Sequence, residues 1–284
     1  MKSFNGVNKI YTEDCINFMQ NWNGDKISVI VTSPPYNFDK DYSKYKDNKK
    51  RQEYIDWMGE VARNSYNILV QEGSFFLNIV GRPTDALLPF DVVREFCKYF
   101  QLQNTIHWVK SIALNQKHKG KTTKELNGDL AVGHFKPLNS DRYFNQCHEY
   151  IFHFTKTGNN KLDKLAIGVP YAHPSNLVRW KTKNKTRDRG NVWFIPYENK
   201  QGAFIPIKHP SEFPEKLPYL CIKAHGVKKN MLVYDPFTGL GTTAMACVRL
   251  GINFIGTDID ANYVKIANSQ IKAHEKYLKE SNAV

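Results

Sequence analysis

The chain has 284 residues, of which 41% are hydrophobic and 13% aromatic. This composition excludes an intrinsically disordered chain, and the length suits one α/β domain with an appendage or two small domains. Lysine and arginine number 40 against 27 acidic residues, which gives a net charge of +13. Such an excess favours a polyanionic partner such as nucleic acid, although many basic cytosolic proteins bind none.

The cysteines and the apolar runs indicate the compartment. Five scattered cysteines without CxxC spacing argue against a disulfide framework and against a zinc site, so no metal is expected. The first residues lack the apolar core of a signal peptide, and no apolar run approaches the roughly 20 residues of a membrane span. We therefore expect a soluble, cytoplasmic protein without a membrane partner.

The first half of the chain alternates between strand and helix patterns. Residues 27–32 are apolar and β-branched, which predicts a buried parallel strand ending at Pro34. A polar, lysine-rich stretch at 39–51 is expected to be a mobile loop. The later patterns predict a helix at 52–69, a strand at 75–80, a helix at 87–100 and a strand at 105–109. This alternation is typical of a mostly parallel sheet covered by helices.

Two polar, basic regions interrupt this alternation. Residues 111–145 show little periodicity and are expected to form a basic loop, and residues 159–206 are similar but richer in aromatic residues. Regular structure is predicted between and after them, as a strand at 149–155, a helix at 215–225, strands at 231–234 and 253–257, and helices from 242 and 261. We expect one α/β core interrupted by a basic, mostly non-sheet insertion.

A glycine turn near the end of the chain indicates a nucleotide-like ligand. The strand that ends at Asp235 is followed by Phe237-x-Gly239-x-Gly241. Glycine at these positions allows positive φ and the close approach of a ligand to the backbone. Thr242 and the threonine after it are placed to cap the next helix, whose N-terminus would face a carboxylate.

An acid follows this turn at the spacing expected for ribose binding. Asp258 ends the next strand, 19 residues after Gly239, where a carboxylate can accept both ribose hydroxyls. The third glycine of the dinucleotide fingerprint is missing, which disfavours NAD.

A stiff loop follows the first buried strand. Its sequence is Ser33-Pro34-Pro35-Tyr36, and each proline fixes φ and removes an N–H. This sequence resembles the catalytic loop of enzymes that methylate the exocyclic amine of a base. Such an amine is a poor nucleophile, because its lone pair is delocalised into the ring, so its direct methylation requires acceptors that hold the N–H groups. The loop could aim a main-chain carbonyl and the Ser33 side chain at such an amine, while Tyr36 stacks on the flipped base.

The two loops together resemble the catalytic and S-adenosylmethionine loops of amino-methylating DNA methyltransferases. Their order, with the catalytic loop first, is that of the permuted β-group of restriction-modification systems. The resemblance implies a circularly permuted, Rossmann-like methyltransferase core of the α/β class, with a mixed, mostly parallel sheet and an inserted target-recognition region. The implied domains are a catalytic half at 1–156 with the basic loop 111–145, the recognition insertion at 157–207, and a cofactor-binding half at 208–284.

The resemblance also implies further contacts with S-adenosylmethionine. Asp14 and Cys15 resemble the family's third cofactor segment, where an acid often approaches the adenine amino group; capping of a helix that starts at Cys15 is an equal alternative for Asp14. The segment around Phe213 resembles the lead-in to a cofactor-side helix, which would place Phe213 against the methionine end of the cofactor.

The nature of the target base depends on Ser33. Adenine-N6 enzymes of the group usually carry aspartate at this position and often lysine at that of Phe213. A neutral serine both donates and accepts, which suits cytosine N3 beside N4, whereas a carboxylate only accepts. We therefore favour cytosine N4 and keep adenine N6 as the alternative. Cytosine-C5 chemistry is excluded, because no Pro-Cys pair occurs.

Two other classes of function remain as alternatives. RNA and protein-glutamine methyltransferases use a related loop, but they place the cofactor loop first and usually carry asparagine before the two prolines. A non-catalytic nucleic-acid-binding module would have no reason to combine both loops with Asp258.

A run of alternating cations predicts a DNA-binding surface. In an extended strand, side chains on every second residue point to one face, which is useful along a phosphate backbone. The six cations are Arg179, Lys181, Lys183, Lys185, Arg187 and Arg189. A solvated basic loop is the alternative interpretation. The expected partner is double-stranded DNA, with a possible cognate restriction endonuclease acting separately and with a monomer or homodimer as the oligomeric state.

Overall fold

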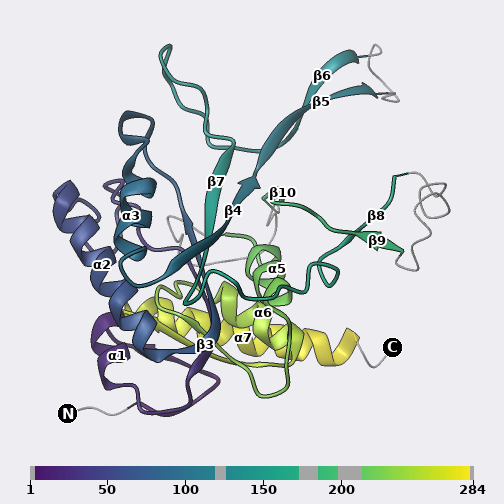
Figure 1. Ribbon diagram of the computed structural model, residues 1–284. Helices are drawn as coiled ribbons and strands as arrows, with labels where there is room; N and C mark the ends of the chain where they lie inside the picture. Colours follow the sequence, from purple (N-terminus) through teal and green to yellow (C-terminus); the bar gives the residue numbers. More distant parts are fainter. Residues whose placement is uncertain (1–3, 119–125, 173–184, 198–212, 282–284) are drawn as a thin grey trace.

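The computed structural model describes residues 4–118, 126–172, 185–197 and 213–281. At its centre is an eight-stranded sheet with the order β1-β12-β11-β2-β3-β7-β4-β10 (Figure 1). Strand β7 is antiparallel to both of its neighbours, and the other described pairings are parallel. The strands are β1 (Lys9–Thr12), β2 (Ile27–Thr32), β3 (Leu69–Ile79), β4 (Gln101–Val109), β7 (His148–Thr155), β10 (Val192–Phe194), β11 (Leu232–Asp235) and β12 (Asn253–Asp258).

Helices cover both faces of this sheet, so the fold is the expected α/β class. One face carries α1 (Cys15–Asn21), α2 (Arg51–Ile68) and α3 (Leu88–Phe96), with a short 3-10 helix at Pro83–Asp85 before α3. The other carries α5 (Lys216–His225), α6 (Thr242–Leu250) and α7 (Ala261–Ser281).

The burial of strand β2 on both faces explains why its sequence is mostly apolar. Its side chains alternate between the two faces, so Ile30 packs with the first helix set while Val29 and Val31 pack with the second. A strand buried on both faces has no polar face to alternate with, and its sequence is a continuous apolar run.

The core elements predicted from residue patterns are confirmed, and two strands of the sheet were not predicted. Strand β1 lies at one edge of the sheet and pairs with β12. Strand β10 lies at the other edge and pairs with β4, with Trp193 opposite Trp108. Since β10 falls within residues 157–207, part of the segment predicted as a recognition insertion belongs to the core sheet.

The expected basic loop at 111–145 is wrong for its first part. Strands β5 (Ser111–His118) and β6 (Leu126–Gly133) form an antiparallel hairpin that projects from the sheet (Figure 1). The register places Ile112 opposite Val132 and Leu114 opposite Leu130. Such cross-strand apolar pairs on one face stabilise a hairpin even where the intervening residues are polar.

Strands β8 (Val169–Pro170) and β9 (Thr186–Arg187) form a separate two-stranded ribbon. Among the helices that the structure describes, none combines the length and the apolar character needed to cross a membrane.

Candidate active site

The catalytic loop and the cofactor loop lie at the same edge of the sheet. Strands β2 and β11 are parallel neighbours, so the loops that follow them begin side by side. The Thr32 hydroxyl donates to Asp235 Oδ1 at 2.6 Å and thereby joins the two strand ends directly. Two residues that are 203 positions apart in the sequence are thus held in contact.

Asp235 is fully engaged within its own loop. Besides Thr32, its carboxylate accepts from the Thr243 hydroxyl at 2.7 Å and from the Phe237 N–H at 3.0 Å. Burial raises the pKa of Asp235 to about 6, against the opposing effect of these donors. Asp235 was predicted to bind cofactor, and the structure places it behind the cavity wall as a support for the loop.

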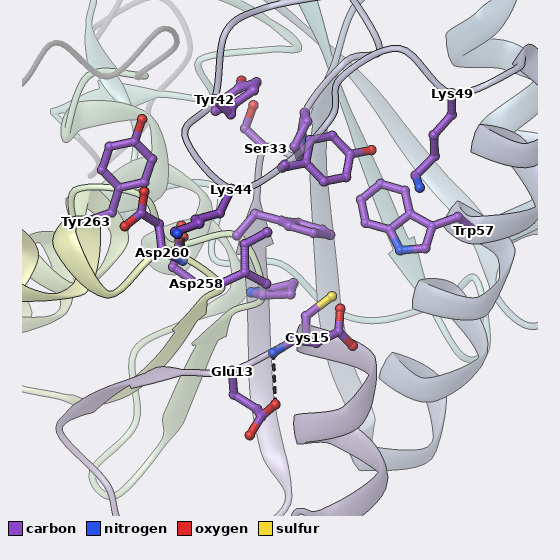
Figure 2. Close-up of a pocket in the computed structure, with 16 residues that line it drawn as sticks. Glu13, Cys15, Ser33, Tyr42, Lys44, Lys49, Trp57, Asp258, Asp260 and Tyr263 are labelled. Carbon is purple, nitrogen blue, oxygen red and sulfur yellow. Dashed lines mark hydrogen bonds between the residues drawn. The ribbon is translucent and has the colours of Figure 1, made fainter.

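A cavity of about 250 Å³ lies between the two loops (Figure 2). Its walls come from the start of α1, the catalytic loop, residues 42–49, helix α2, the cofactor loop and the start of α7. The lining residues are Glu13, Asp14, Cys15, Ser33, Pro35, Tyr42, Lys44, Tyr45, Lys49, Trp57, Pro236, Phe237, Asp258, Ile259, Asp260 and Tyr263.

The cofactor loop holds Asp258 through Gly239, although neither Gly239 nor Gly241 is among the residues that line the cavity. Gly239 has φ 52° and Gly241 has φ 86°, so both adopt the left-handed conformation that favours glycine. The Gly239 N–H donates to Asp258 Oδ2 at 3.0 Å, and the Asp260 N–H donates to Asp258 Oδ1 at 2.8 Å. Burial raises the pKa of Asp258 to about 6. These contacts hold the carboxylate at the cavity.

The predicted caps of α6 are wrong. The residue before the helix is Gly241, which has no side chain to cap with, and the Thr243 hydroxyl binds Asp235. Thr242 is buried at the first position of α6. The N-terminus of α6 therefore keeps the cofactor side clear of side-chain caps.

Of the predicted cofactor residues, Asp14, Cys15, Phe237 and Asp258 line the cavity. Asp14 also caps α1, because its Oδ1 accepts from the N–H groups of Ile16 at 3.0 Å and Asn17 at 2.9 Å. The capping alternative is thus confirmed, and the same side chain still reaches the cavity.

Phe213 is not brought to the cavity. Its ring packs against the hydrophobic cluster beneath α5 and α6. Residues 198–212, which precede it, lie outside the described residues.

The stretch at 39–51 is also part of this site. It supplies Tyr42, Lys44, Tyr45 and Lys49 to the cavity. The Tyr45 ring stacks on Trp57 of α2 with the centroids 5.7 Å apart. The expectation of a loop is confirmed, and the structure adds that it folds over the cavity.

The turn that leads into this stretch is built around Asp47. The buried Asp47 carboxylate accepts from the N–H groups of Asn37 at 2.8 Å, Phe38 at 3.0 Å and Lys40 at 3.2 Å. The Asn37 side chain donates through its Nδ2 to the Lys49 carbonyl and accepts through its Oδ1 from the Lys49 N–H. These bonds tie the turn before the covering segment, residues 39–51, to Asp47 and Lys49 within it, and the mobility of the segment stays a prediction.

The catalytic loop enters the cavity through Ser33 and Pro35, while Pro34 is buried. The Pro35 carbonyl accepts from the Tyr54 hydroxyl of α2 at 2.8 Å, which anchors the loop. Tyr36 is buried, and its ring packs edge-on against Phe38 at 5.7 Å.

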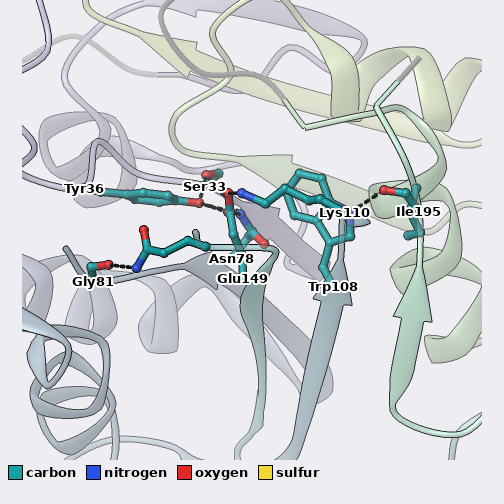
Figure 3. Close-up of polar contacts among 9 residues, drawn as sticks. Ser33, Tyr36, Asn78, Gly81, Trp108, Lys110, Glu149 and Ile195 are labelled. Carbon is teal, nitrogen blue, oxygen red and sulfur yellow. Dashed lines mark hydrogen bonds and ion pairs between the residues drawn. The ribbon is translucent and has the colours of Figure 1, made fainter. Parts of the chain in front are cut away.

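A buried polar network adjoins Ser33, and sequence reasoning missed most of it (Figure 3). The Ser33 hydroxyl lies 2.8 Å from the Tyr36 hydroxyl, which donates to Glu149 Oε2 at 2.8 Å. The Asn78 amide donates to the same Glu149 oxygen at 2.7 Å, and Lys110 Nζ donates to Glu149 Oε1 at 3.0 Å. Asn78 and Lys110 lie at the ends of β3 and β4, and Glu149 lies at the start of β7. The sequence signal that could have found them is a polar residue at the end of a buried strand that borders the active site.

The predicted DNA-binding cations are only partly described. Lys185 and Arg187 are exposed, and Arg187 is in the short strand β9. Arg189 is half-buried, and its Nε donates to the Ile167 carbonyl at 2.9 Å, so it holds the backbone instead of facing outward. The other three, Arg179, Lys181 and Lys183, lie outside the described residues.

Comparison with known proteins agrees with this geometry. The sequence model of the family described as DNA methylase, which groups N6 and N4 enzymes, matches residues 27–269. The chain belongs to this family. It is an amino-methylating DNA methyltransferase, its substrate is DNA, and its methyl donor is S-adenosylmethionine.

Three comparisons give the range of similarity. The type II methyltransferase M.BglII of Bacillus subtilis is 28% identical over 92% of this chain and 68% of its own length. The DNA adenine methyltransferase YhdJ of Escherichia coli K12 is 24% identical over 91% of this chain and 81% of its own length. The solved structure of the PvuII DNA methyltransferase, described as cytosine-N4-specific, has a TM-score of 0.66 and 19% identity, covering 96% of this chain and 93% of that one.

The residues of the cavity fit this cofactor. Its carboxylates can accept ribose and amino hydrogens and offset a sulfonium charge, even though the chain as a whole is strongly positive. Its two lysines, Lys44 and Lys49, can pair with the carboxylate of the cofactor's methionine part. Phe237 and Trp57 provide faces on which an adenine ring can stack.

Proposed function

We propose that the chain methylates the N4 amine of a cytosine flipped out of double-stranded DNA, as the modification enzyme of a restriction-modification system. The observation that carries the choice of base is Ser33 in the cavity wall, because its neutral oxygen repels the lone pair of cytosine N3 less than a carboxylate would. Adenine N6 is the alternative, and the similarity to an adenine methyltransferase supports it.

The roles proposed for the residues follow from their positions. Asp14, Phe237 and Asp258 hold the cofactor, and Gly239 and Gly241 let it approach the backbone. When bound, S-adenosylmethionine supplies an electrophilic methyl group. Ser33 holds the amine beside that group, and the covering segment at 39–51 keeps water away. Tyr36 is not among the residues that line the cavity, so we propose that it supports the flipped base indirectly, through its hydroxyl contact with Ser33.

We also propose that residues 157–207 carry target recognition, between a catalytic half at 1–156 and a cofactor half at 208–284. Exposed Lys185 and Arg187 suit contacts with phosphates. A cognate restriction endonuclease would act as a separate protein, and methylation of one flipped base needs no more than a monomer, with a homodimer suited to a palindromic target.

Nucleoside mass spectrometry tests this proposal. Purified protein is incubated with mixed-sequence duplex DNA and methyl-labelled S-adenosylmethionine, and the digested nucleosides are analysed. Labelled N4-methylcytosine is the expected product. Labelled N6-methyladenine would overturn the choice of base and leave the amino-methyltransferase assignment in place. Label in RNA or protein but not in DNA would overturn the proposed substrate.

A further inference from the structure

The network beneath Ser33 is built around one carboxylate that the proposed function has not used. Both oxygens of Glu149 are engaged, one by Tyr36 and Asn78 and the other by Lys110. The Glu149 and Lys110 side chains are only 9% and 11% exposed. A buried ion pair adds little to stability on balance, because the loss of hydration offsets the attraction between the charges. Its presence at the active site therefore calls for a functional explanation.

The donor directions in the network can be read from its chemistry. A tyrosine hydroxyl has one proton, and that of Tyr36 goes to Glu149 Oε2. The contact of 2.8 Å between Ser33 and Tyr36 therefore has Ser33 as the donor. With its proton directed to Tyr36, the Ser33 oxygen faces the cavity as an acceptor.

The orientation of the Asn78 amide agrees with these donor directions. Its amide nitrogen lies within reach of the Ser33, Tyr36 and Glu149 oxygens. Its buried carbonyl oxygen has no hydrogen-bond partner among the described residues, which is costly. The reverse orientation would place that carbonyl against the Glu149 carboxylate. The amide is thus held with its N–H groups toward the three oxygens.

We propose that Ser33, Tyr36 and Glu149 form a proton relay that removes one proton from the substrate amine during methyl transfer. This inference rests on the proposed function, but it applies to cytosine N4 and adenine N6 alike. Ser33 touches the amine, whereas Tyr36 and Glu149 act through it. Lys110 donates to the other oxygen of Glu149 and fixes the position of that carboxylate.

The amine nitrogen uses its lone pair to form a bond to the methyl carbon, and the carbon–sulfur bond breaks with its electron pair on sulfur. The nitrogen loses one proton to the Ser33 oxygen as Ser33 passes its own proton to Tyr36, and Tyr36 passes its proton to Glu149. The positive charge that leaves sulfur is thus cancelled at the Glu149 carboxylate. Burial and the neighbouring Glu149 raise the pKa of Tyr36 well above its ordinary value, so Tyr36 carries a proton before and after the step.

The relay is tested with Glu149→Gln, which keeps the shape of the side chain, and with Tyr36→Phe, which removes one oxygen and keeps the ring. General acid–base groups contribute roughly 10²–10⁴-fold to rate, so each variant should lower the single-turnover rate of methylation by about 100-fold or more. Cofactor affinity should stay within about threefold, because neither group lines the cavity. Tyr150→Phe is the matched control, since it removes a hydroxyl from the next residue of β7.

Chemical rescue separates proton acceptance from mere support. Glu149→Ala leaves space for a small carboxylate, and added formate should restore part of its rate, while chloride at equal ionic strength should not. The wild-type single-turnover rate should also fall in D₂O, and Tyr36→Phe should reduce that isotope effect.

Two failures are distinguishable. If the wild type transfers no methyl group to DNA, the proposed function fails. If the wild type is active while Glu149→Gln and Tyr36→Phe retain its rate within twofold, or formate rescues no better than chloride, the relay alone is overturned.

Discussion

The Thr32 hydroxyl donates to the Asp235 carboxylate at 2.6 Å, in a site where both side chains are buried. Thr32 is the last residue of β2 and Asp235 the last of β11. This bond sets the spacing between the residue before the catalytic loop and the residue before the cofactor loop. Thr32 and Asp235 thus link the starts of the two loops through a contact outside the residues that line the cavity.

Loss of this contact should be visible in stability. Thr32→Val keeps the side-chain shape but removes a donor from a buried acceptor, which should lower the free energy of unfolding by about 1–3 kcal/mol. Urea unfolding measures the change. Thr12→Val, at an exposed position of β1, is the matched control and should have little effect. Equal values for the two variants would show that the Thr32–Asp235 bond does not stabilise the sheet.

Ser33→Ala should separate chemistry from cofactor binding. Loss of a group that holds the reacting amine should lower turnover by roughly 10²–10³-fold. The dissociation constant of S-adenosylmethionine should change little, since the other lining residues remain. Single-turnover methylation and calorimetric titration with cofactor measure the two quantities. An active Ser33→Ala enzyme would rule out the role given to this hydroxyl.

Gly239→Val should abolish cofactor binding. A β-branched residue at φ 52° is strained, and the Gly239 N–H also holds Asp258 at the cavity. Gly251→Val is an instructive control, because Gly251 has a similar φ of 65° but nothing lies within 4 Å of an added Cβ. Calorimetry should show binding by the Gly251 variant and not by the Gly239 variant. Loss of binding in both would indicate that general backbone strain, and not the loop, is responsible.

Two histidines, His153 in β7 and His225 at the end of α5, should make stability depend on pH. Ser74 Oγ lies 3.0 Å from His153 Nε2 and 2.9 Å from His225 Nδ1. Burial lowers the pKa of His153 to about 3 and that of His225 to about 4, from an ordinary value of 6.5. The unfolded chain therefore binds more protons between about pH 4 and 6.5, and these groups contribute stability above pH 6.5 that is lost as the pH falls.

The acids act in the opposite sense. The raised pKa values of Asp235 and Asp258 give stability at low pH that is lost as the pH rises from 3.8 to about 6. The wild type alone would thus show a partly cancelled dependence. We expect His225→Gln to lose less stability than the wild type between pH 7 and pH 5, as measured by urea unfolding. An unchanged pH dependence would contradict the assignment to His225.

The exposed cations should contribute to DNA affinity through phosphate contacts. Lys185→Ala and Arg187→Ala should each weaken binding of duplex DNA similarly for all sequences. Each should also lower the slope of log affinity against log salt by about 1. Fluorescence anisotropy over a range of salt concentrations measures both effects. Lys276→Ala on α7 is the control, because its side chain is 78% exposed on another element. Slopes unchanged from the wild type would remove this ribbon from the DNA interface.

Much of the fold could be predicted because its signals are local. The apolar run of β2 and the glycine turn after β11 can each be recognised from a short stretch of sequence. Strand β10 could not be predicted in this way, since three residues become a strand only by pairing with β4. In the polar stretch at 39–51, the aromatic residues Tyr42 and Tyr45 were the signal that this stretch packs against the rest of the protein, as Tyr45 does on Trp57.

The active-site network shows the same limit more sharply. Asn78, Lys110 and Glu149 come from three strands, and they meet only because β7 lies between β3 and β4 and runs antiparallel to both. No spacing along the chain records that reversal. A charged residue at the end of an apolar strand, such as Lys110 or Glu149, can therefore indicate a functional site even where the adjacent sequence contains no motif.

The strand order has a consequence for synthesis of the protein. Strand β1 pairs with β12, so Ile10 cannot form its pairing until Gly256 has been synthesised. Strand β2 likewise lacks its neighbour β11 until the C-terminal part of the chain has been made. At roughly 5–20 residues per second, this delay is on the order of tens of seconds. During that time the apolar strand β2 presents an unpaired edge to other chains. The strand order therefore leaves this edge of β2 open until the C-terminal part of the chain has been made.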